Sequence, residues 1–158
     1  IIACLVGSEM CIRDRAWDLM VTYGYLEAEY KDYLADLTGD GVITDNSGLI
    51  PRNTPENTFG ITTSYTTQVG DGELKGRISY RFRDEMNSDS SNNPYGDLDS
   101  IENLNATINY SIDNYSITIW GRNLTDEREQ RWATIGGLTS RGWWNEPQTL
   151  GITFSASY

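Results

Sequence analysis

Apolar and polar residues alternate with a period of two along most of this sequence, and this pattern constrains the fold more than any other feature. The last segment is the clearest case, because apolar residues at 150, 152, 154, 156 and 158 are separated by glycine, threonine or serine. Successive side chains of a β-strand point to opposite faces. The pattern therefore predicts strands with one apolar and one polar face.

The alternation predicts six long strands, at residues 17–30, 57–69, 73–86, 102–113, 115–124 and 148–158. Each has about ten residues or more, which is the length that a tilted strand needs to cross an outer membrane. Strands of soluble proteins are shorter, at about five or six residues. We therefore expect an all-β fold, a transmembrane antiparallel meander, rather than a sandwich.

The connections between these strands alternate in length. Tight turns at Asp113-Asn114 and at 70–72 alternate with long polar loops at 31–56, 87–101 and 125–147. Tight periplasmic turns and long extracellular loops are typical of outer-membrane barrels, the smallest of which have about eight strands. Six strands would leave open edges in lipid, with backbone groups lacking partners. The sequence thus predicts an open piece of a larger barrel.

Composition excludes several classes of function. The net charge of −11 argues against a nucleic-acid partner. Histidine is absent, which removes the usual general base and metal ligand. No apolar run approaches the length of a transmembrane helix. We find no catalytic set of residues and expect a protein that is not an enzyme.

The first residues differ in character from the rest. Residues 5–15, which read LVGSEMCIRDR, resemble the translation of a sequencing-library adapter. We therefore expect residues 1–16 to be non-native and exclude them from the fold, so that the barrel domain is 17–158. A short secretory signal is the alternative, although it would lack a basic start. Cys4 and Cys11 both lie in this segment and carry no information about disulfides.

The run from Gly121 to Glu127, which reads GRNLTDE, resembles the penultimate-strand motif of TonB-dependent receptors. Residues 146–158 resemble their closing strand, with Gln148 where arginine is frequent and Leu150 where an aromatic residue is frequent. Residues 51–59 resemble the start of an earlier barrel strand. The resemblance covers 17–158.

This resemblance implies a barrel of about 22 strands, of which these would be the last six. It implies a receptor in the outer membrane of a Gram-negative bacterium, surrounded by outer-membrane lipid. Such receptors import a scarce small-molecule ligand, such as an iron–siderophore complex, cobalamin or an oligosaccharide, and need no cofactor. Their partners are a plug domain of the same receptor and, through it, the TonB complex. Phe154 and Tyr158 would form the signal read by the barrel-assembly machinery, or anchor the strand at the membrane interface.

Two groups of residues are candidates for ligand contact. Lys75, Arg77, Arg81 and Arg83 share one face of a strand and would point into the lumen. They would guide an anionic ligand or, as we favour, pair with acidic groups of the plug or of neighbouring strands. The last loop holds the other group, Trp132, Trp143, Trp144, Arg128, Arg131 and Arg141. These residues would stack on and ion-pair with a ligand, or pack the loop against its neighbours.

The loop at 36–47 is a candidate calcium site. Asp36, Thr38 and Asp40, followed by Gly41, match the first half of an EF-hand loop, but Ser47 stands where the bidentate glutamate belongs. An acidic turn without metal is the simpler interpretation. The carboxylate pairs at 84–85 and 126–127 are interpreted as solvated charges.

Two other functions stay open at this point. A soluble β-sandwich that binds carbohydrate through its tryptophan-rich loop would bury the apolar faces against each other. A passive porin would share the barrel but not the two C-terminal motifs.

Overall fold

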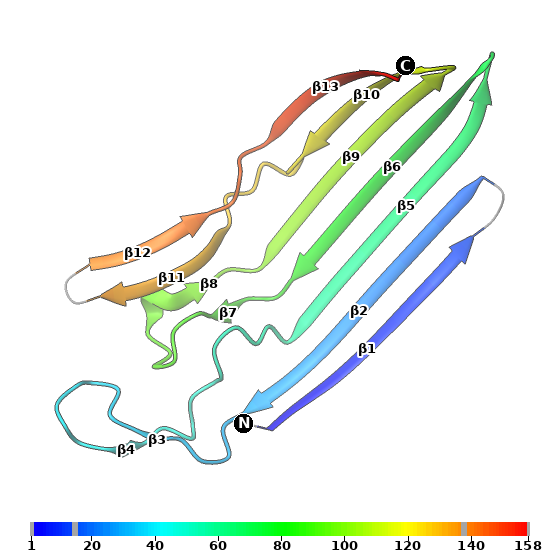
Figure 1. The fold of residues 1–158 in the computed structure, drawn as a ribbon. Helices are drawn as coiled ribbons and strands as arrows, with labels where there is room; N and C mark the ends of the chain where they lie inside the picture. Colours follow the sequence, from blue (N-terminus) through cyan, green and yellow to red (C-terminus); the bar gives the residue numbers. More distant parts are fainter. Residues whose placement is uncertain (1, 14–15, 137–138, 158) are drawn as a thin grey trace.

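Seven long strands form one antiparallel sheet in the computed structural model, which describes residues 2–13, 16–136 and 139–157. The spatial order is β1-β2-β5-β6-β9-β10-β13, so each strand pairs with the preceding and following long strand of the chain (Figure 1). The strands are β1 (Ile2–Arg13), β2 (Trp17–Glu29), β5 (Asn57–Val69), β6 (Gly72–Arg83), β9 (Ile101–Ile112), β10 (Tyr115–Arg122) and β13 (Thr149–Ala156). The expected all-β antiparallel meander is confirmed.

The register joins the apolar residues of neighbouring strands into one continuous face. Val21 of β2 lies opposite Ile61, and Ile61 in turn lies opposite Tyr80. This face is open: Ile78 is 51% exposed and Ile108 is 54% exposed. In the part of the chain that the structure describes, the buried apolar side chains are those of Pro51, Leu98 and Ile101, at the long-loop end, and no second sheet covers the apolar face there. A β-sandwich requires such a covering sheet.

Short and long connections lie at opposite ends of the sheet (Figure 1). The β5–β6 and β9–β10 turns are tight, and each starts with a residue of positive φ, Gly70 (62°) and Asp113 (50°). Glycine and aspartate adopt this left-handed conformation more readily than most residues. The other end carries three small hairpins: β3 (Leu34–Ala35) with β4 (Thr44–Asp45), β7 (Met86–Asn87) with β8 (Asp97–Leu98), and β11 (Gln130–Gly136) with β12 (Thr139–Trp144).

The β11–β12 hairpin was not predicted from the sequence, because its strands lack a clean alternation of apolar and polar residues. It lies beside β8 and the short 3-10 turn η1 (Pro94–Gly96), so the last two long connections touch each other (Figure 1). No helix among the described residues is long and apolar enough to span a membrane.

Strand β1 is the main difference from the expected fold, since we excluded residues 1–16. It pairs with β2 along its whole length, from Ile2 opposite Glu29 to Arg13 opposite Asp18. A free sheet edge offers unpaired N–H and C=O groups to any extended segment. The pairing therefore follows from the edge of β2, and a non-native origin of residues 1–16 stays a prediction.

Candidate functional site

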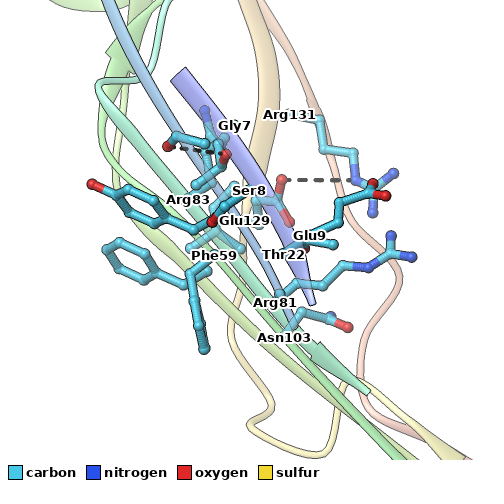
Figure 2. Close-up of a pocket in the computed structure, with 16 residues that line it drawn as sticks. Gly7, Ser8, Glu9, Thr22, Phe59, Arg81, Arg83, Asn103, Glu129 and Arg131 are labelled. Atoms are coloured by element: carbon cyan, nitrogen blue, oxygen red, sulfur yellow. Dashed lines mark hydrogen bonds and ion pairs between the residues drawn. The ribbon is translucent and has the colours of Figure 1, made fainter. Parts of the chain in front are cut away.

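The polar face of the sheet contains a hollow of about 570 Å³ near its long-loop end. Residues of five strands and of the last loop line it (Figure 2). Those that give it its chemical character are Thr22, Gly24, Thr58 and Gly60 in the floor, Arg81, Arg83 and Asn103 along the side, and Glu129 and Arg131 above. The size lies within the range of small-molecule pockets.

Two glycines on neighbouring strands form the floor of this hollow. A Cβ added to Gly24 would lie 2.7 Å from the hydroxyl oxygen of Thr58, and one added to Gly60 would lie 2.6 Å from that of Thr22. Each threonine side chain thus lies over a glycine, and a larger residue there would require the threonine hydroxyl to move. The floor consequently carries hydroxyl groups.

The basic residues of β6 have neutral neighbours on both sides. Arg81 lies between Gly60 and Asn103, and Arg83 lies between Thr58 and Ile101. Lys75 and Arg77 are likewise flanked by Thr66, Asn109, Ser64 and Thr107. Over the described ranges, ion pairs join only Arg13 to Asp18 and Arg131 to Glu129. No ion pair within 4 Å therefore joins the β6 residues to acidic groups of the described neighbouring strands, and their pairing with acidic groups of a plug or of neighbouring strands stays a prediction.

Arg83 lies at the edge of the hollow, and only one of its three guanidinium nitrogens has a hydrogen-bond partner. Its Nη2 donates a hydrogen bond to the carbonyl oxygen of Asp99 at 3.1 Å. Its Nε and Nη1 are buried without a hydrogen-bond partner. Above it, Arg131 Nε lies 3.9 Å from a carboxylate oxygen of Glu129 (Figure 2). The Glu129 side chain is 13% exposed and that of Arg131 is 65% exposed, so the carboxylate is nearly buried while the guanidinium still faces solvent.

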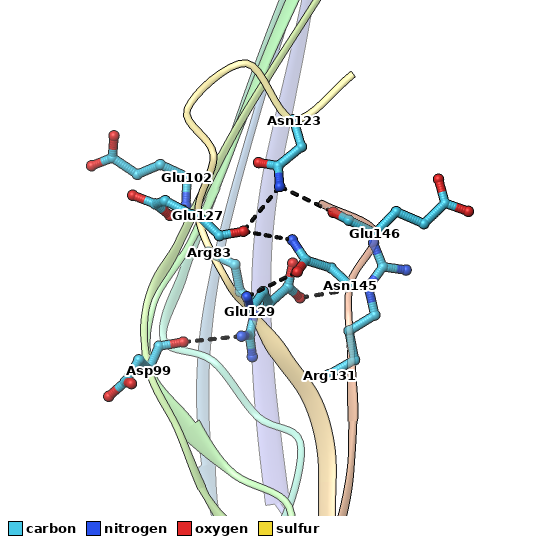
Figure 3. Close-up of polar contacts among 9 residues, drawn as sticks. All are labelled: Arg83, Asp99, Glu102, Asn123, Glu127, Glu129, Arg131, Asn145 and Glu146. Carbon is cyan, nitrogen blue, oxygen red and sulfur yellow. Dashed lines mark hydrogen bonds and ion pairs between the residues drawn. The ribbon is translucent and has the colours of Figure 1, made fainter. Parts of the chain in front are cut away.

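A cluster of hydrogen bonds at the base of the last loop positions Glu129 and Arg131 over the sheet (Figure 3). The buried side chain of Asn123 donates to the carbonyl oxygens of Glu127 at 2.9 Å and Glu146 at 3.0 Å. Asn145 donates to the same Glu127 carbonyl at 3.0 Å and accepts from the Glu129 backbone N–H at 3.0 Å. The GRNLTDE run and the residues before β13 thus act together to fix the start of the loop.

Three of the four carboxylates interpreted as solvated charges, those of Asp84, Asp126 and Glu127, have structural roles instead, while Glu85 is exposed. Asp84 accepts hydrogen bonds from the backbone and side-chain nitrogens of Asn57, at 2.9 and 2.7 Å. Glu127 accepts from the backbone N–H of Glu102 at 3.0 Å, and Asp126 accepts from that of Gln148 at 3.3 Å. Each satisfies a backbone donor at the end of a strand, where the ladder of hydrogen bonds stops.

The structure separates the candidate residues of the last loop. Only Arg131 lines the hollow; Arg128 and Arg141 are exposed and do not line it. Trp143 and Trp144 are exposed on β12. The backbone of Trp132 pairs with Trp143, but the Trp132 side chain lies outside the described part. Trp143 and Trp144 do not line the hollow, and ligand contact by the three tryptophans stays a prediction.

The candidate calcium loop folds around its own first carboxylate. Asp36 accepts hydrogen bonds from the backbone N–H groups of Gly41 and Gly39, each at 2.7 Å, and from the N–H and hydroxyl of Thr38. These bonds, that of Gly41 foremost, lower the pKa of Asp36 below its ordinary value. Asp40 accepts from the N–H of Val42 at 2.8 Å. Among the residues described, no group of three or more acidic, histidine or cysteine side chains is placed to hold a metal, so calcium binding at Asp36, Thr38 and Asp40 stays a prediction.

Trp120 is a residue of the polar face that the sequence analysis did not assign. Its indole N–H donates to the hydroxyl of Thr153 at 3.1 Å, and the guanidinium carbon of Arg122 lies 5.2 Å from the ring centroid. A Cβ on Gly151 would meet the ring at 2.2 Å. Strict alternation from Ile119 was the signal that would have placed Trp120 on this face.

Of the two residues of the expected assembly signal, the structure describes Phe154. Phe154 is exposed on the apolar face and stacks against Tyr115, with ring centroids 6.1 Å apart. Tyr158 lies outside the described residues. An exposed aromatic pair at the tight-turn end fits an interfacial position.

Comparison with known proteins identifies a solved structure with the same fold, but no matching family model or curated protein. No model of a protein family matches the chain, and no curated protein matches it. Among solved structures, the chain is similar to the ferric yersiniabactin uptake receptor FyuA from Yersinia pestis, with a TM-score of 0.81 and 16% sequence identity. The similarity covers 99% of this chain and 23% of that receptor. The chain thus has the all-β fold of a piece of a β-barrel receptor.

Proposed function

We propose that this chain forms part of the wall of a TonB-dependent outer-membrane receptor that imports a scarce ligand. The observation that carries the proposal is the asymmetry of the sheet. One face is apolar and open from β2 to β13, while the other is polar and carries a hollow beneath the last loop. A barrel wall has this design, with lipid on one side and a water-filled or plugged lumen on the other.

The open edges of the sheet support the part of the proposal that concerns size. Strands β1 and β13 each have one paired neighbour, so one side of each is an edge. An unpaired backbone group costs several kcal/mol in hydrocarbon, so a membrane sheet must close. Further strands would therefore have to close the barrel. The resemblance to TonB-dependent receptors implies a total of about 22 strands and a plug domain inside them.

An iron–siderophore complex is the ligand class that we favour. The support is the likeness in fold to a receptor that takes up ferric yersiniabactin; cobalamin and oligosaccharides are the alternatives. A passive porin is the second candidate function, and it shares the open apolar face. The two are separated by whether uptake requires energy from the TonB complex.

The test is made on the complete gene product in its host. We expect the protein in the outer-membrane fraction, with a mobility on gels that changes on boiling. We also expect uptake of one labelled ligand, from a panel of ferric siderophores, cobalamin and oligosaccharides, that is lost on deletion of either the receptor or TonB. Recovery as a soluble monomer would contradict the barrel, and uptake that persists without TonB would indicate a porin.

A further inference from the structure

We propose that Arg81, Arg83 and Arg131 form an anion-binding site in the hollow of the polar face, and that its ligand is a small polycarboxylate. The inference rests on the proposed function, because it places the site inside a receptor lumen. It joins residues from two groups that the sequence analysis kept apart, the basic strand and the last loop.

The first support is an excess of positive charge that the sheet does not neutralise. Arg81 and Arg83 have neutral residues opposite them on both neighbouring strands. Arg131 meets them from above, and of the three only Arg131 has a carboxylate within ion-pair distance. In a chain of net charge −11, three arginines line the hollow with two carboxylates, those of Glu9 and Glu129, so that positive charge is in excess there. Glu9 belongs to the segment predicted to be non-native; without that segment the excess of positive charge is larger and the hollow is open on that side.

The second support is unused hydrogen-bonding capacity. Each guanidinium offers five N–H donors in a planar fork that matches a carboxylate. Arg83 uses one nitrogen on the Asp99 carbonyl, and its Nε and Nη1 have no partner. Buried donors without partners carry a desolvation cost. A ligand oxygen near Arg83 would relieve that cost, provided that the guanidinium turns toward the hollow.

The third support is Glu129, which shows the chemistry that the site accepts. Its carboxylate is nearly buried and approaches Arg131 only to 3.9 Å, beyond the length of a direct hydrogen bond. The Glu129 carboxylate therefore lies beside the arginines but does not form a direct hydrogen bond with Arg131. A ligand carboxylate could bind the arginines in a bidentate fashion and replace this loose contact.

The dimensions favour more than one anionic group on the ligand. Arg81 and Arg83 are two residues apart on one face, which separates their Cα atoms by about 7 Å. Arg131 approaches from a different element, and Figure 2 shows its side chain on the same side of the hollow as that of Arg81. Arg83 lines the hollow with its guanidinium bonded to the Asp99 carbonyl. Asn103 and the threonine hydroxyls of the floor add neutral hydrogen-bonding groups. A compact molecule with two or three carboxylates matches this arrangement.

The test measures equilibrium binding of labelled tricarballylate, a tricarboxylate, to the full-length receptor purified in detergent. Trimethyl tricarballylate is the neutral control and inorganic phosphate is the competing anion. We expect saturable binding that weakens with salt, and an R81Q or R131Q variant that raises the Kd about tenfold, as loss of a charge-assisted hydrogen bond does. The matched control is R77Q, four residues from Arg81 on the same face but outside the hollow, where we expect a change of less than about twofold.

The opposite change is expected for E129Q. Removal of the competing carboxylate should lower the Kd several-fold, whereas a residue with only a structural role would raise it. This variant keeps the proposal testable if an arginine variant fails to assemble, because the bond to Asn145 comes from the backbone N–H of residue 129 and does not depend on its side chain. The proposal is overturned if R77Q weakens binding as much as R81Q, if E129Q weakens it, if the neutral ester binds equally well, or if phosphate displaces tricarballylate at lower concentration. None of these results changes the fractionation and uptake outcomes that test the proposed function.

Discussion

An arginine placed at Ile78 tests whether the open face meets hydrocarbon. Ile78 is the sixth residue after the start of β6, which places it about 20 Å along a strand of about 36 Å. With a tilt of about 40°, its height above the tight turn is about 15 Å, close to the middle of an apolar band of about 25 Å. An arginine at the bilayer midplane costs about 2–4 kcal/mol. We therefore expect I78R to lower the ratio of folded to unfolded receptor about 30- to 900-fold.

The matched control is T62R, on the opposite face at nearly the same depth. Thr62 lies between Met20 and Ser79 in the register, so an arginine there meets no charge directly across the sheet. A lumen-facing position stays hydrated, and we expect a change within about 0.5 kcal/mol.

The assay is guanidinium unfolding of the full receptor in lipid vesicles, followed by tryptophan fluorescence, with mobility on unboiled gels as a check of assembly. The reasoning is refuted if I78R unfolds at the same denaturant concentration as the unaltered receptor. It is equally refuted if T62R costs as much as I78R, because the two faces would then have the same surroundings.

Three further changes probe other parts of the structure. N123A removes both bonds to the Glu127 and Glu146 carbonyls. Because Asn145 still donates to the Glu127 carbonyl, only the Glu146 carbonyl loses its partner, at about 1–3 kcal/mol, and trypsin should cleave the last loop on intact cells faster than in the unaltered receptor. G151A places a methyl group against the Trp120 ring and should cost about 1–3 kcal/mol; a W120A second change should restore much of the lost thermal stability. The pKa of Asp36 is lowered in the folded loop. At a pH above the ordinary carboxyl pKa, the ionised carboxylate therefore stabilises the loop. This stabilisation is lost as the pH falls through the lowered pKa. Amide exchange at 38–41, corrected for the intrinsic dependence of exchange on pH, should thus be more strongly protected at pH 7 than at pH 3, and D36N should remove the difference.

Most of the sheet could be predicted because one side of each predicted long strand is mainly apolar, with polar exceptions such as Thr63 and Thr67. The strand at 57–69 has the predicted bounds, and the others differ by one to three residues at their ends. Those differences have local causes. The strand expected at 115–124 ends at Arg122, because Asn123 takes a left-handed conformation, with φ of 50°. Its side chain then joins the cluster of hydrogen bonds at the base of the last loop.

The candidate site could be predicted only in its parts. Alternation was enough to place Arg81 and Arg83 on the polar face, because the period of a strand fixes the direction of its side chains. The position of Arg131 depends instead on the fold of an irregular loop, which no periodic pattern encodes. The neutral neighbours of the arginines also depend on strand register, which alternation leaves free to shift by two residues.

The hydrogen-bonded cluster at the base of the last loop has a consequence for how the proposed receptor can change during evolution. Its anchor points, Asn123 and Asn145, stand outside the β11–β12 hairpin and hold it mainly through backbone carbonyls. Insertions, deletions or exchanges between these two residues would leave the pairing of the seven long strands unchanged. Since Glu129 and Arg131 lie within the exchanged stretch, a new ligand preference would be transferred together with it.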